Sequence, residues 1–245
     1  MIICEIGLNH LGDEEYALEY VSKILSTDVD AITFQIRESD FYVDTYDSFI
    51  LSDNFYRNIV EKIKNSNVLI GIALSDIKKI PFFDSLNIDF FKILSKDFKN
   101  NKLISEMLKT KKHIYISTGT VNELEISNFI NNFSPKKSFF TLIHTQMSYN
   151  IEDVNLKAIS ILQKKFQLPV AYGNHSHNYL TTFVALGFEP SDIFIYVKGN
   201  KNKSHPDEVH SIPLENLETF VHDLKELKKS IGHGVKNTTV NTITD

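Results

Sequence analysis

The sequence predicts a single (β/α)8 barrel, and three observations support this fold class. The chain has 245 residues, close to the roughly 250 that such a barrel needs. Apolar, strand-like runs alternate with amphipathic helical patterns along the chain, which is typical of a parallel sheet with crossover helices. The strand-like runs are continuously apolar, as expected when both faces of a sheet are covered. The rival is an open doubly wound sheet, but the first turn lacks the glycine-rich dinucleotide pattern.

The expected strands and helices follow one another in strict alternation. The strands are the apolar runs Ile2–Leu8, Ala31–Arg37, Val68–Ser75, Phe90–Ser95, His113–Gly119, Phe139–Thr145, Pro169–His175 and Asp192–Lys198. The amphipathic stretches between and after them include Glu14–Leu25, Asn54–Asn65, Asn122–Phe133, Val154–Phe166 and Leu214–Ser230. We expect residues 1–231 to form the barrel. Residues 232–245 are polar and rich in Thr and Asn, and we expect a frayed tail there.

Composition excludes several classes of function. The net charge of −5 and the pI near 6.0 give no electrostatic case for binding nucleic acid or an acidic membrane. Cys4 is the only cysteine, so no disulfide framework or thiolate metal cluster is expected. It lies in an apolar run, which favours a small buried core residue over a reactive thiol. No leader pattern and no apolar run of about 18 residues is present, which predicts a cytoplasmic protein.

Polar residues gather where the predicted strands end. The first strand runs into a glycine-containing turn with Glu5, Asn9 and His10. Three later strands end in Lys92–Ser95, Ile116–Gly119 and Tyr172–His175. The carboxyl ends of all strands meet at one mouth in a parallel barrel, and active sites lie there. An acid, an amide, a lysine, hydroxyls and a histidine at this mouth indicate an enzyme or the descendant of one.

These strand ends carry a resemblance to a known family. The matching segments, in order, are Glu5–Asp13, Phe34–Gln35, Lys92–Ser95 with Asp97, Ile116–Gly119, His144–Thr145 with Tyr149, Glu152–Leu156, Tyr172–Ser176 and Pro206–Asp207. Together they resemble the sialic acid synthase family, whose members condense phosphoenolpyruvate with an N-acetylated amino sugar. The resemblance also implies a homodimer. Family members usually continue into an antifreeze-like domain, and we expect none in this chain.

The resemblance assigns roles to the residues at the mouth. Lys92 would bind phosphoenolpyruvate, with Ser95 and Ser117 donating hydrogen bonds to it. Glu5 would lie near the reacting carbons and would accept or donate protons there. The residues alone leave a structural alternative open, since burying an unpaired lysine is costly. In that alternative the lysine forms a buried ion pair with Glu5, Asp89 or Asp97.

A divalent metal, Mn²⁺ or Mg²⁺, is also implied. His175 matches one of two histidines that hold this ion, which acts as a Lewis acid on the sugar aldehyde. The second ligand position falls on Tyr196, and a neutral tyrosine is a poor substitute for imidazole. The open alternative is therefore a site without a metal.

Other positions depart from the family pattern. The strand-two lysine is Thr33, an asparagine is Met147 and an inward-facing glutamate is Phe194. Arg37 and Lys198 could compensate as cations, or could extend past the rim into solvent. The remaining substrate-binding residues implied by the resemblance are Asp97, where the family usually has glutamate, and Gln35, Tyr149 and Asp207, which would orient the sugar.

Three functional hypotheses follow. The first is a synthase that condenses phosphoenolpyruvate with an aldehyde sugar in nonulosonic acid or surface carbohydrate biosynthesis. The second is a catalytically degenerate barrel that binds a sugar or assembles with an active synthase. The third is another carbonyl or phosphate chemistry on the same barrel, such as an aldolase that forms a Schiff base through Lys92 or Lys198.

Overall fold

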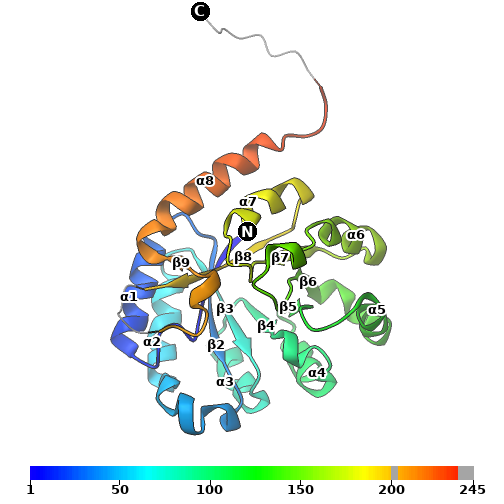
Figure 1. Cartoon of the computed structure of the whole chain (residues 1–245). Coiled ribbons are helices and arrows are strands. Elements are labelled where there is room, and N and C mark those ends of the chain that lie inside the picture. Colours follow the sequence, from blue (N-terminus) through cyan, green and yellow to red (C-terminus); the bar gives the residue numbers. More distant parts are fainter. Residues whose placement is uncertain (200–203, 237–245) are drawn as a thin grey trace, which may run out of the picture.

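A computed structural model, which describes residues 1–199 and 204–236, contains a closed barrel of parallel strands (Figure 1). The strands are β1 (Ile2–Gly7), β2 (Ala31–Ile36), β3 (Leu69–Leu74), β4 (Phe90–Ile93), β5 (His113–Ser117), β6 (Phe140–His144), β7 (Val170–Gly173) and β8 (Ile193–Lys198). Each strand pairs with the next, and β1 also pairs with β8, which closes the barrel. The predicted fold class is confirmed. A short β9 (Ile212–Pro213) pairs with the end of β8.

Helices cover the outside of the barrel. They are α1 (Glu14–Leu25), α2 (Asp53–Lys64), α3 (Ile80–Ser85), α4 (Asn101–Lys109), α5 (Glu123–Asn132), α6 (Lys157–Phe166), α7 (Leu180–Ala185) and α8 (Leu217–Ser230). Side-chain caps fix several of their starts, because they satisfy amide groups that have no partner within the helix. Ser52 accepts from Phe55 N, and Asn122 and Glu125 form a capping box.

Two predicted helices begin later than expected. The stretch predicted from Val154 is helical only from Lys157, because Asn155 adopts a positive φ of 47° that an α-helix does not accommodate. Residues Leu214–Asn216 form a separate 3-10 turn, and α8 starts after it. Most of the predicted polar tail, residues 237–245, lies outside the described residues.

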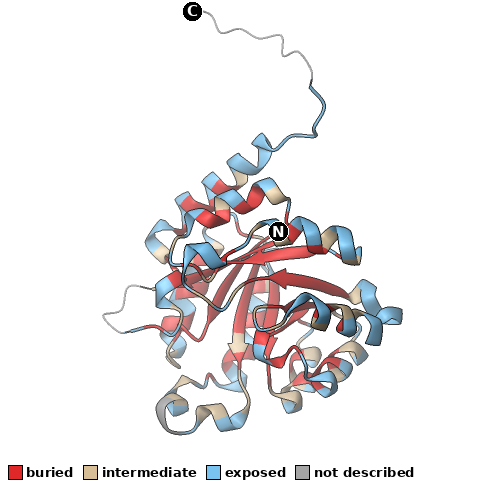
Figure 2. Ribbon diagram, turned by 45° about the vertical axis from the view of Figure 1, so that its right-hand side comes forward, coloured by how far each residue is buried: buried red, intermediate tan, exposed pale blue. Residues whose placement is uncertain are grey.

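The strands are buried on both faces (Figure 2). One apolar cluster lies between the barrel and its helices, and Cys4 is fully buried in it, as predicted. A second cluster fills the barrel interior and contains Phe90, Tyr115 and Phe194, whose rings meet edge to face with centroids 5.1 Å apart. Gly71 is required beside them, because a Cβ there would lie 2.1 Å from the Phe90 ring. These aromatic rings close the middle of the barrel and form a floor beneath its mouth.

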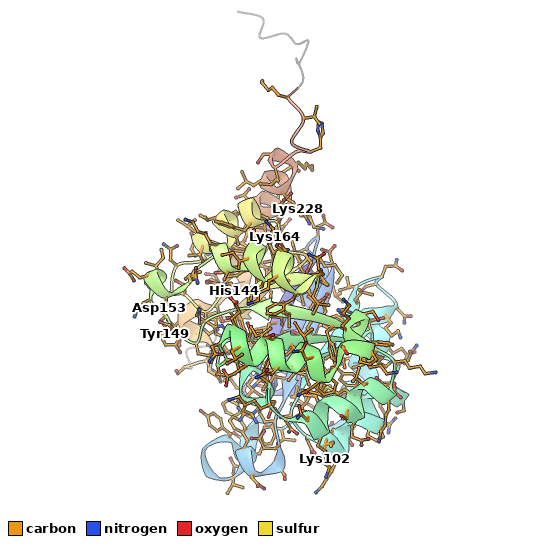
Figure 3. The ribbon with its side chains drawn as sticks, turned by 90° about the vertical axis from the view of Figure 1, so that its right-hand side faces the viewer. Lys102, His144, Tyr149, Asp153, Lys164 and Lys228 are labelled. Atoms are coloured by element: carbon orange, nitrogen blue, oxygen red, sulfur yellow. The ribbon has the colours of Figure 1, made fainter. Side chains whose placement is uncertain are left out.

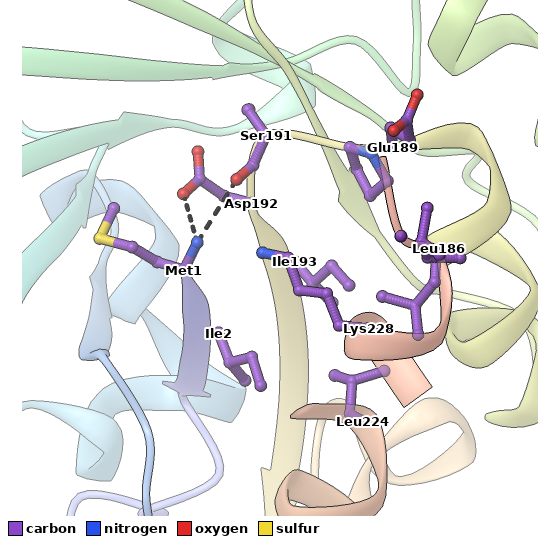
Figure 4. Close-up of a pocket in the computed structure, with 12 residues that line it drawn as sticks. Met1, Ile2, Leu186, Glu189, Ser191, Asp192, Ile193, Leu224 and Lys228 are labelled. Carbon is purple, nitrogen blue, oxygen red and sulfur yellow. Dashed lines mark hydrogen bonds and ion pairs between the residues drawn. The ribbon is translucent and has the colours of Figure 1, made fainter. Parts of the chain in front are cut away.

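At the amino-terminal end of the barrel, Met1, directly before β1, contacts the residues that precede β8. The Met1 amine donates to Asp192 Oδ1 at 2.9 Å and to Ser191 O at 3.4 Å (Figure 4). A cavity of about 200 Å³ beside this contact is lined partly by Leu186, Ile193 and Leu224. It lies opposite the strand ends at which the polar residues gather.

The lysines of the helices point outward. Lys164 and Lys228 are exposed on α6 and α8, on the outside of the molecule (Figure 3). Within residues 1–199 and 204–236, no helix combines the length and apolar character needed to cross a bilayer.

Candidate active site

A polar layer lies directly above the aromatic floor. Inward-facing residues alternate along each strand, so Glu5 and Tyr196 lie two residues beyond Ile3 and Phe194 of the floor. Strand pairing places Glu5 opposite both Thr33 and Tyr196. A cavity of about 230 Å³ opens at this level, and its lining comprises Gln35, Arg37, Lys92, Leu94, Ser95, Lys96, Ser117, Thr120, Met147, His175, Tyr196 and Asp207. The carboxyl ends of the strands thus bring most of the predicted site residues together.

A buried ion pair joins Glu5 and Lys92. Lys92 Nζ donates to Glu5 Oε2 at 2.5 Å and lies 3.4 Å from the Tyr196 hydroxyl. Burial by itself would lower the pKa of Lys92, but Glu5 and Tyr196 outweigh it, so this pKa is raised above its ordinary value. The ammonium also lies 4.9 Å from the centroid of the Phe194 ring. The cavity therefore contains a fixed cation.

The other acids suggested for Lys92 have different partners. Asp89 Oδ2 accepts from the Ile70 amide at 2.8 Å. Asp97 accepts from Ser75 Oγ at 2.5 Å and lies 3.1 Å from Lys96 Nζ. Asp97 is buried behind the cavity lining and acts there as a partner of Ser75 and Lys96.

Two serine hydroxyls that line the cavity are hydrogen-bonded to each other. Ser95 Oγ lies 2.7 Å from Ser117 Oγ, and the Gly119 amide donates to Ser95 Oγ at 3.2 Å. Thr120 Oγ1 donates to the Ser95 carbonyl at 2.7 Å, which fixes the backbone. The two hydroxyls satisfy each other here, and both can turn to donate to an anion.

Three rings meet on the other side of the mouth. His175, which follows β7, has its Nδ1 2.6 Å from Thr145 Oγ1. Its ring centroid lies 5.0 Å from that of Tyr196 and 4.7 Å from that of His210. Burial lowers the pKa of His175 to about 3 and that of His210 to about 4, with Lys92 acting in the same direction. Both imidazoles are therefore neutral near pH 7.

His210 did not emerge from the sequence, because it belongs to no predicted strand end. It reaches the mouth on a 3-10 turn, Glu208–His210, between β8 and β9. The only sequence signal near it is its position three residues after Asp207. Asp207 itself lines the cavity, and burial together with the Glu5 charge raises its pKa to about 6.

The remaining predicted residues lie at the rim. Arg37 lines the cavity, pairs with Glu38 at 3.2 Å and stacks on Phe41. Lys198 lies 3.4 Å from Glu208 Oε1 and is not among the cavity-lining residues in the described part of the chain. Tyr149 is half exposed in the loop after β6, at the edge of the molecule in Figure 3.

Only a few side chains at the mouth could bind a divalent metal. In the described residues no three His, Cys, Asp or Glu side chains gather closely enough to hold a metal. The donors that do meet are two neutral imidazoles, His175 and His210, with the Asp207 carboxylate nearby. This set fits an ion whose other positions are open to water or substrate and does not fit a closed structural site.

Fold and cavity together define a (β/α)8 barrel with a polar cavity at its mouth, the place where barrels of this class carry their active sites. The chain belongs to the NeuB family, whose family model matches residues 16–236. This confirms the resemblance inferred from the strand ends.

Individual relatives agree with this assignment. The chain is 24% identical to the N,N'-diacetyllegionaminic acid synthase of Campylobacter jejuni, over 96% of this chain and 78% of the relative. It is 22% identical to human N-acetylneuraminate-9-phosphate synthase, over 96% of this chain and 72% of the relative. Among solved structures, the sialic acid synthetase of Leptospira borgpetersenii in complex with citrate is similar with a TM-score of 0.89 and 25% identity, over 98% of this chain and 87% of that one.

Proposed function

We propose that this protein is a cytoplasmic synthase that condenses phosphoenolpyruvate with the open-chain aldehyde of an N-acetylated amino sugar. The product would be a nine-carbon acidic sugar for surface carbohydrate. Family membership and relatives named as legionaminic acid and N-acetylneuraminate-9-phosphate synthases support this proposal. The observation that carries it is the placement of Lys92, Ser95 and Ser117 in one cavity at the barrel mouth.

These three residues suit a small phosphorylated carboxylate. Lys92 supplies a buried positive charge, and the two serines supply hydroxyl donors 2.7 Å apart. Hydrogen bonds to a charged acceptor are stronger than those between neutral groups. The two hydroxyls would therefore donate to phosphoenolpyruvate in place of their hydrogen bond to each other. Arg37 lines the same cavity and would add a second cation with a forked donor geometry.

The reaction would form one carbon–carbon bond and release phosphate. C3 of phosphoenolpyruvate attacks the aldehyde carbon, and the aldehyde oxygen takes a proton and becomes a hydroxyl. A water oxygen then bonds to C2, the bond from C2 to the phosphate oxygen breaks, and inorganic phosphate leaves. Glu5 would accept the proton of that water, since its Oε1 has no hydrogen-bond partner among the described residues.

The sugar would lie over the rings at the mouth. Gln35 and Asp207 line the cavity and would orient its hydroxyl groups, with Tyr149 at the rim. His175, held by Thr145, would lie at the aldehyde oxygen. A divalent metal at His175 would polarise that aldehyde as a Lewis acid, and synthases of this family generally depend on a metal.

A non-catalytic barrel is the second candidate. Two observations favour it. Lys92 is already neutralised by Glu5, and Thr33 and Phe194 occupy positions where the resembling family carries a lysine and a glutamate. The Schiff-base aldolase is less well supported, because a lysine with a raised pKa is a poor amine nucleophile. Lys198, the other lysine considered for that chemistry, contacts Glu208 outside the cavity lining.

The test is release of phosphate from phosphoenolpyruvate in the presence of a panel of N-acetylated amino sugars. We expect release that needs both substrates, and a drop of tenfold or more in Ser117→Ala. Exposed His222 on α8 gives a matched control, since His222→Ala should keep the full rate. Binding of phosphoenolpyruvate in a calorimeter without turnover on any sugar would favour the non-catalytic barrel. Absence of phosphoenolpyruvate binding would overturn the synthase and favour the non-catalytic barrel, which would bind a sugar or assemble with an active synthase.

A further inference from the structure

His210 is an unusual residue to find inside the barrel mouth. Its side chain is only 3% exposed. Neither ring nitrogen has a hydrogen-bond partner in the part of the chain that the structure describes. A buried polar group without a partner is costly, and such groups in native proteins call for an explanation. A ring that only filled space between Tyr149, His175 and Tyr196 could be apolar without that cost.

The turn that carries His210 is firmly attached to the barrel. Asn9, in the turn after β1, accepts from the Asp207 amide at 3.0 Å and donates to the Val197 carbonyl at 2.8 Å. Ser211 Oγ donates to the Asp207 carbonyl at 2.6 Å. Directly afterwards, Ile212 of β9 pairs with Val197 of β8. The turn after β1 and the pairing of β9 with β8 thus fix the position of the imidazole, and Asn9 is a positioning residue for it.

His175 is held in the manner of a metal ligand. Its Nδ1 lies 2.6 Å from Thr145 Oγ1. When this nitrogen carries the proton and donates it to Thr145, the lone pair of His175 lies on Nε2. Histidines that bind metals almost always donate a hydrogen bond from their other nitrogen, which fixes both the ring and its tautomer. The ring centroid lies 4.7 Å from that of His210.

Charges of both signs lie near the two imidazoles. Lys92 is positive, but Glu5 is paired with it at 2.5 Å. Asp207 adds a further carboxyl group, with Oδ1 3.7 Å from His210 Nε2, which is too long for a hydrogen bond. A cation between the two rings would give His210 the partner that it lacks. The nearby Asp207 carboxylate would attract such a cation.

We propose that His210 is the second imidazole ligand of a divalent metal centre whose first ligand is His175. Water or substrate oxygens complete the coordination, because no third His, Cys, Asp or Glu joins the two within the described residues. The centre lies at the mouth, beside Tyr196 and the Asp207 carboxyl group. This inference rests on the proposed function and adds to it the second protein ligand at the sugar end of the cavity.

Metal binding is measured on the full chain, freed of metal with a chelator and without either substrate. Co²⁺ is titrated by absorption and Mn²⁺ by calorimetry. We expect one ion per chain and tighter binding of Co²⁺ than of Mn²⁺, following the ordinary order for nitrogen ligands. His175→Ala and His210→Ala should each weaken Co²⁺ binding tenfold or more. Asn9→Ala should weaken it less, and His222→Ala should not change it.

Thermal unfolding of each variant shows whether it is folded, and His210→Gln replaces His210→Ala if the alanine variant is not. Two results would overturn the proposal: no stoichiometric binding by the unaltered chain, or a loss in His175→Ala that His210→Ala and His210→Gln do not share. Because no substrate is present, a chain that binds Co²⁺ through both histidines but turns over no sugar would contradict only the proposed function.

Discussion

Lys92 on β4 donates a 2.5 Å hydrogen bond across the barrel interior to Glu5 on β1. These strands are not neighbours in the sheet, so the ion pair connects opposite parts of the barrel wall. Both side chains are almost completely buried, with 4% and 0% exposure. Desolvation of two charges offsets much of their attraction, so the pair is a poor source of stability although breaking it is costly.

Removing one partner should therefore destabilise the protein strongly. Lys92→Met leaves the Glu5 carboxylate buried without its cation, and we expect a loss of about 3–5 kcal/mol in the free energy of unfolding. The double variant with Glu5→Gln should lose clearly less, because no buried charge is left unpaired. Urea unfolding followed by circular dichroism measures both.

An exposed pair on α4 provides the control. Lys109 and Glu106 lie three residues apart, with 69% and 38% exposure, and Lys109→Met should cost no more than about 1 kcal/mol. If Lys92→Met were as mild as this control, the ion pair between Lys92 and Glu5 would not form in the folded protein.

The strands and the polar residues that line the mouth could be predicted because both depend on local sequence. An apolar run that ends in Lys92–Ser95 predicts a strand and also places its polar end at the mouth. His210 could not be predicted in this way, because the position of its turn depends on the hydrogen bond that the Asp207 amide donates to Asn9, which is distant in sequence. Lys198 lies two residues beyond Tyr196 on β8, so the alternation along the strand predicts that it faces inward. Its ammonium group instead pairs with Glu208 on the following turn.

The cations at the rim should differ in their effect on anion binding. Arg37 lines the cavity, so Arg37→Ala should weaken phosphoenolpyruvate binding about tenfold, or about 1.4 kcal/mol. Lys198 lies outside the lining, and Lys198→Ala should leave the dissociation constant within about twofold, or about 0.4 kcal/mol. Calorimetric titration at one fixed salt concentration compares the two. Equal losses in both variants would show that Lys198 leaves Glu208 and enters the cavity when the anion binds.

The turn after β1 should tolerate no side chain at Gly12. This residue has a φ of +75°, and a Cβ would lie 1.5 Å from the Ser48 carbonyl oxygen. Gly12→Ala should therefore lower the free energy of unfolding by about 2 kcal/mol or more. Gly187 is the matched control, because no described atom lies within 4 Å of its Cβ position. Gly187→Ala should change stability by less than about 0.5 kcal/mol, and a similar loss in both variants would contradict this account of the turn.

Stability should fall in mild acid because of His10. Its ring is 1% exposed, its Nδ1 accepts from the Gly12 amide at 2.9 Å, and burial lowers its pKa to about 3. In the unfolded chain this pKa is about 6.5. Between about pH 6.5 and pH 3 the unfolded chain therefore binds a proton at His10 that the folded protein does not, and the free energy of unfolding decreases as the pH falls through that range. At pH 5 the loss from this group is about 2 kcal/mol relative to neutral pH.

The variant His10→Asn should remove that loss, because Asn keeps an acceptor for Gly12 and does not titrate. His175 and His210 act in the same direction as His10, while the raised pKa of Asp207 acts in the opposite direction, since the folded state holds its proton longer. The difference between the unaltered chain and His10→Asn in how the free energy of unfolding changes with pH gives the contribution of His10 alone. Urea unfolding at pH 7.5 and pH 5 measures it, and His222→Asn should keep the full pH dependence of the unaltered chain. Parallel stability curves for His10→Asn and the unaltered chain would mean that His10 is protonated, and solvated, within the folded barrel.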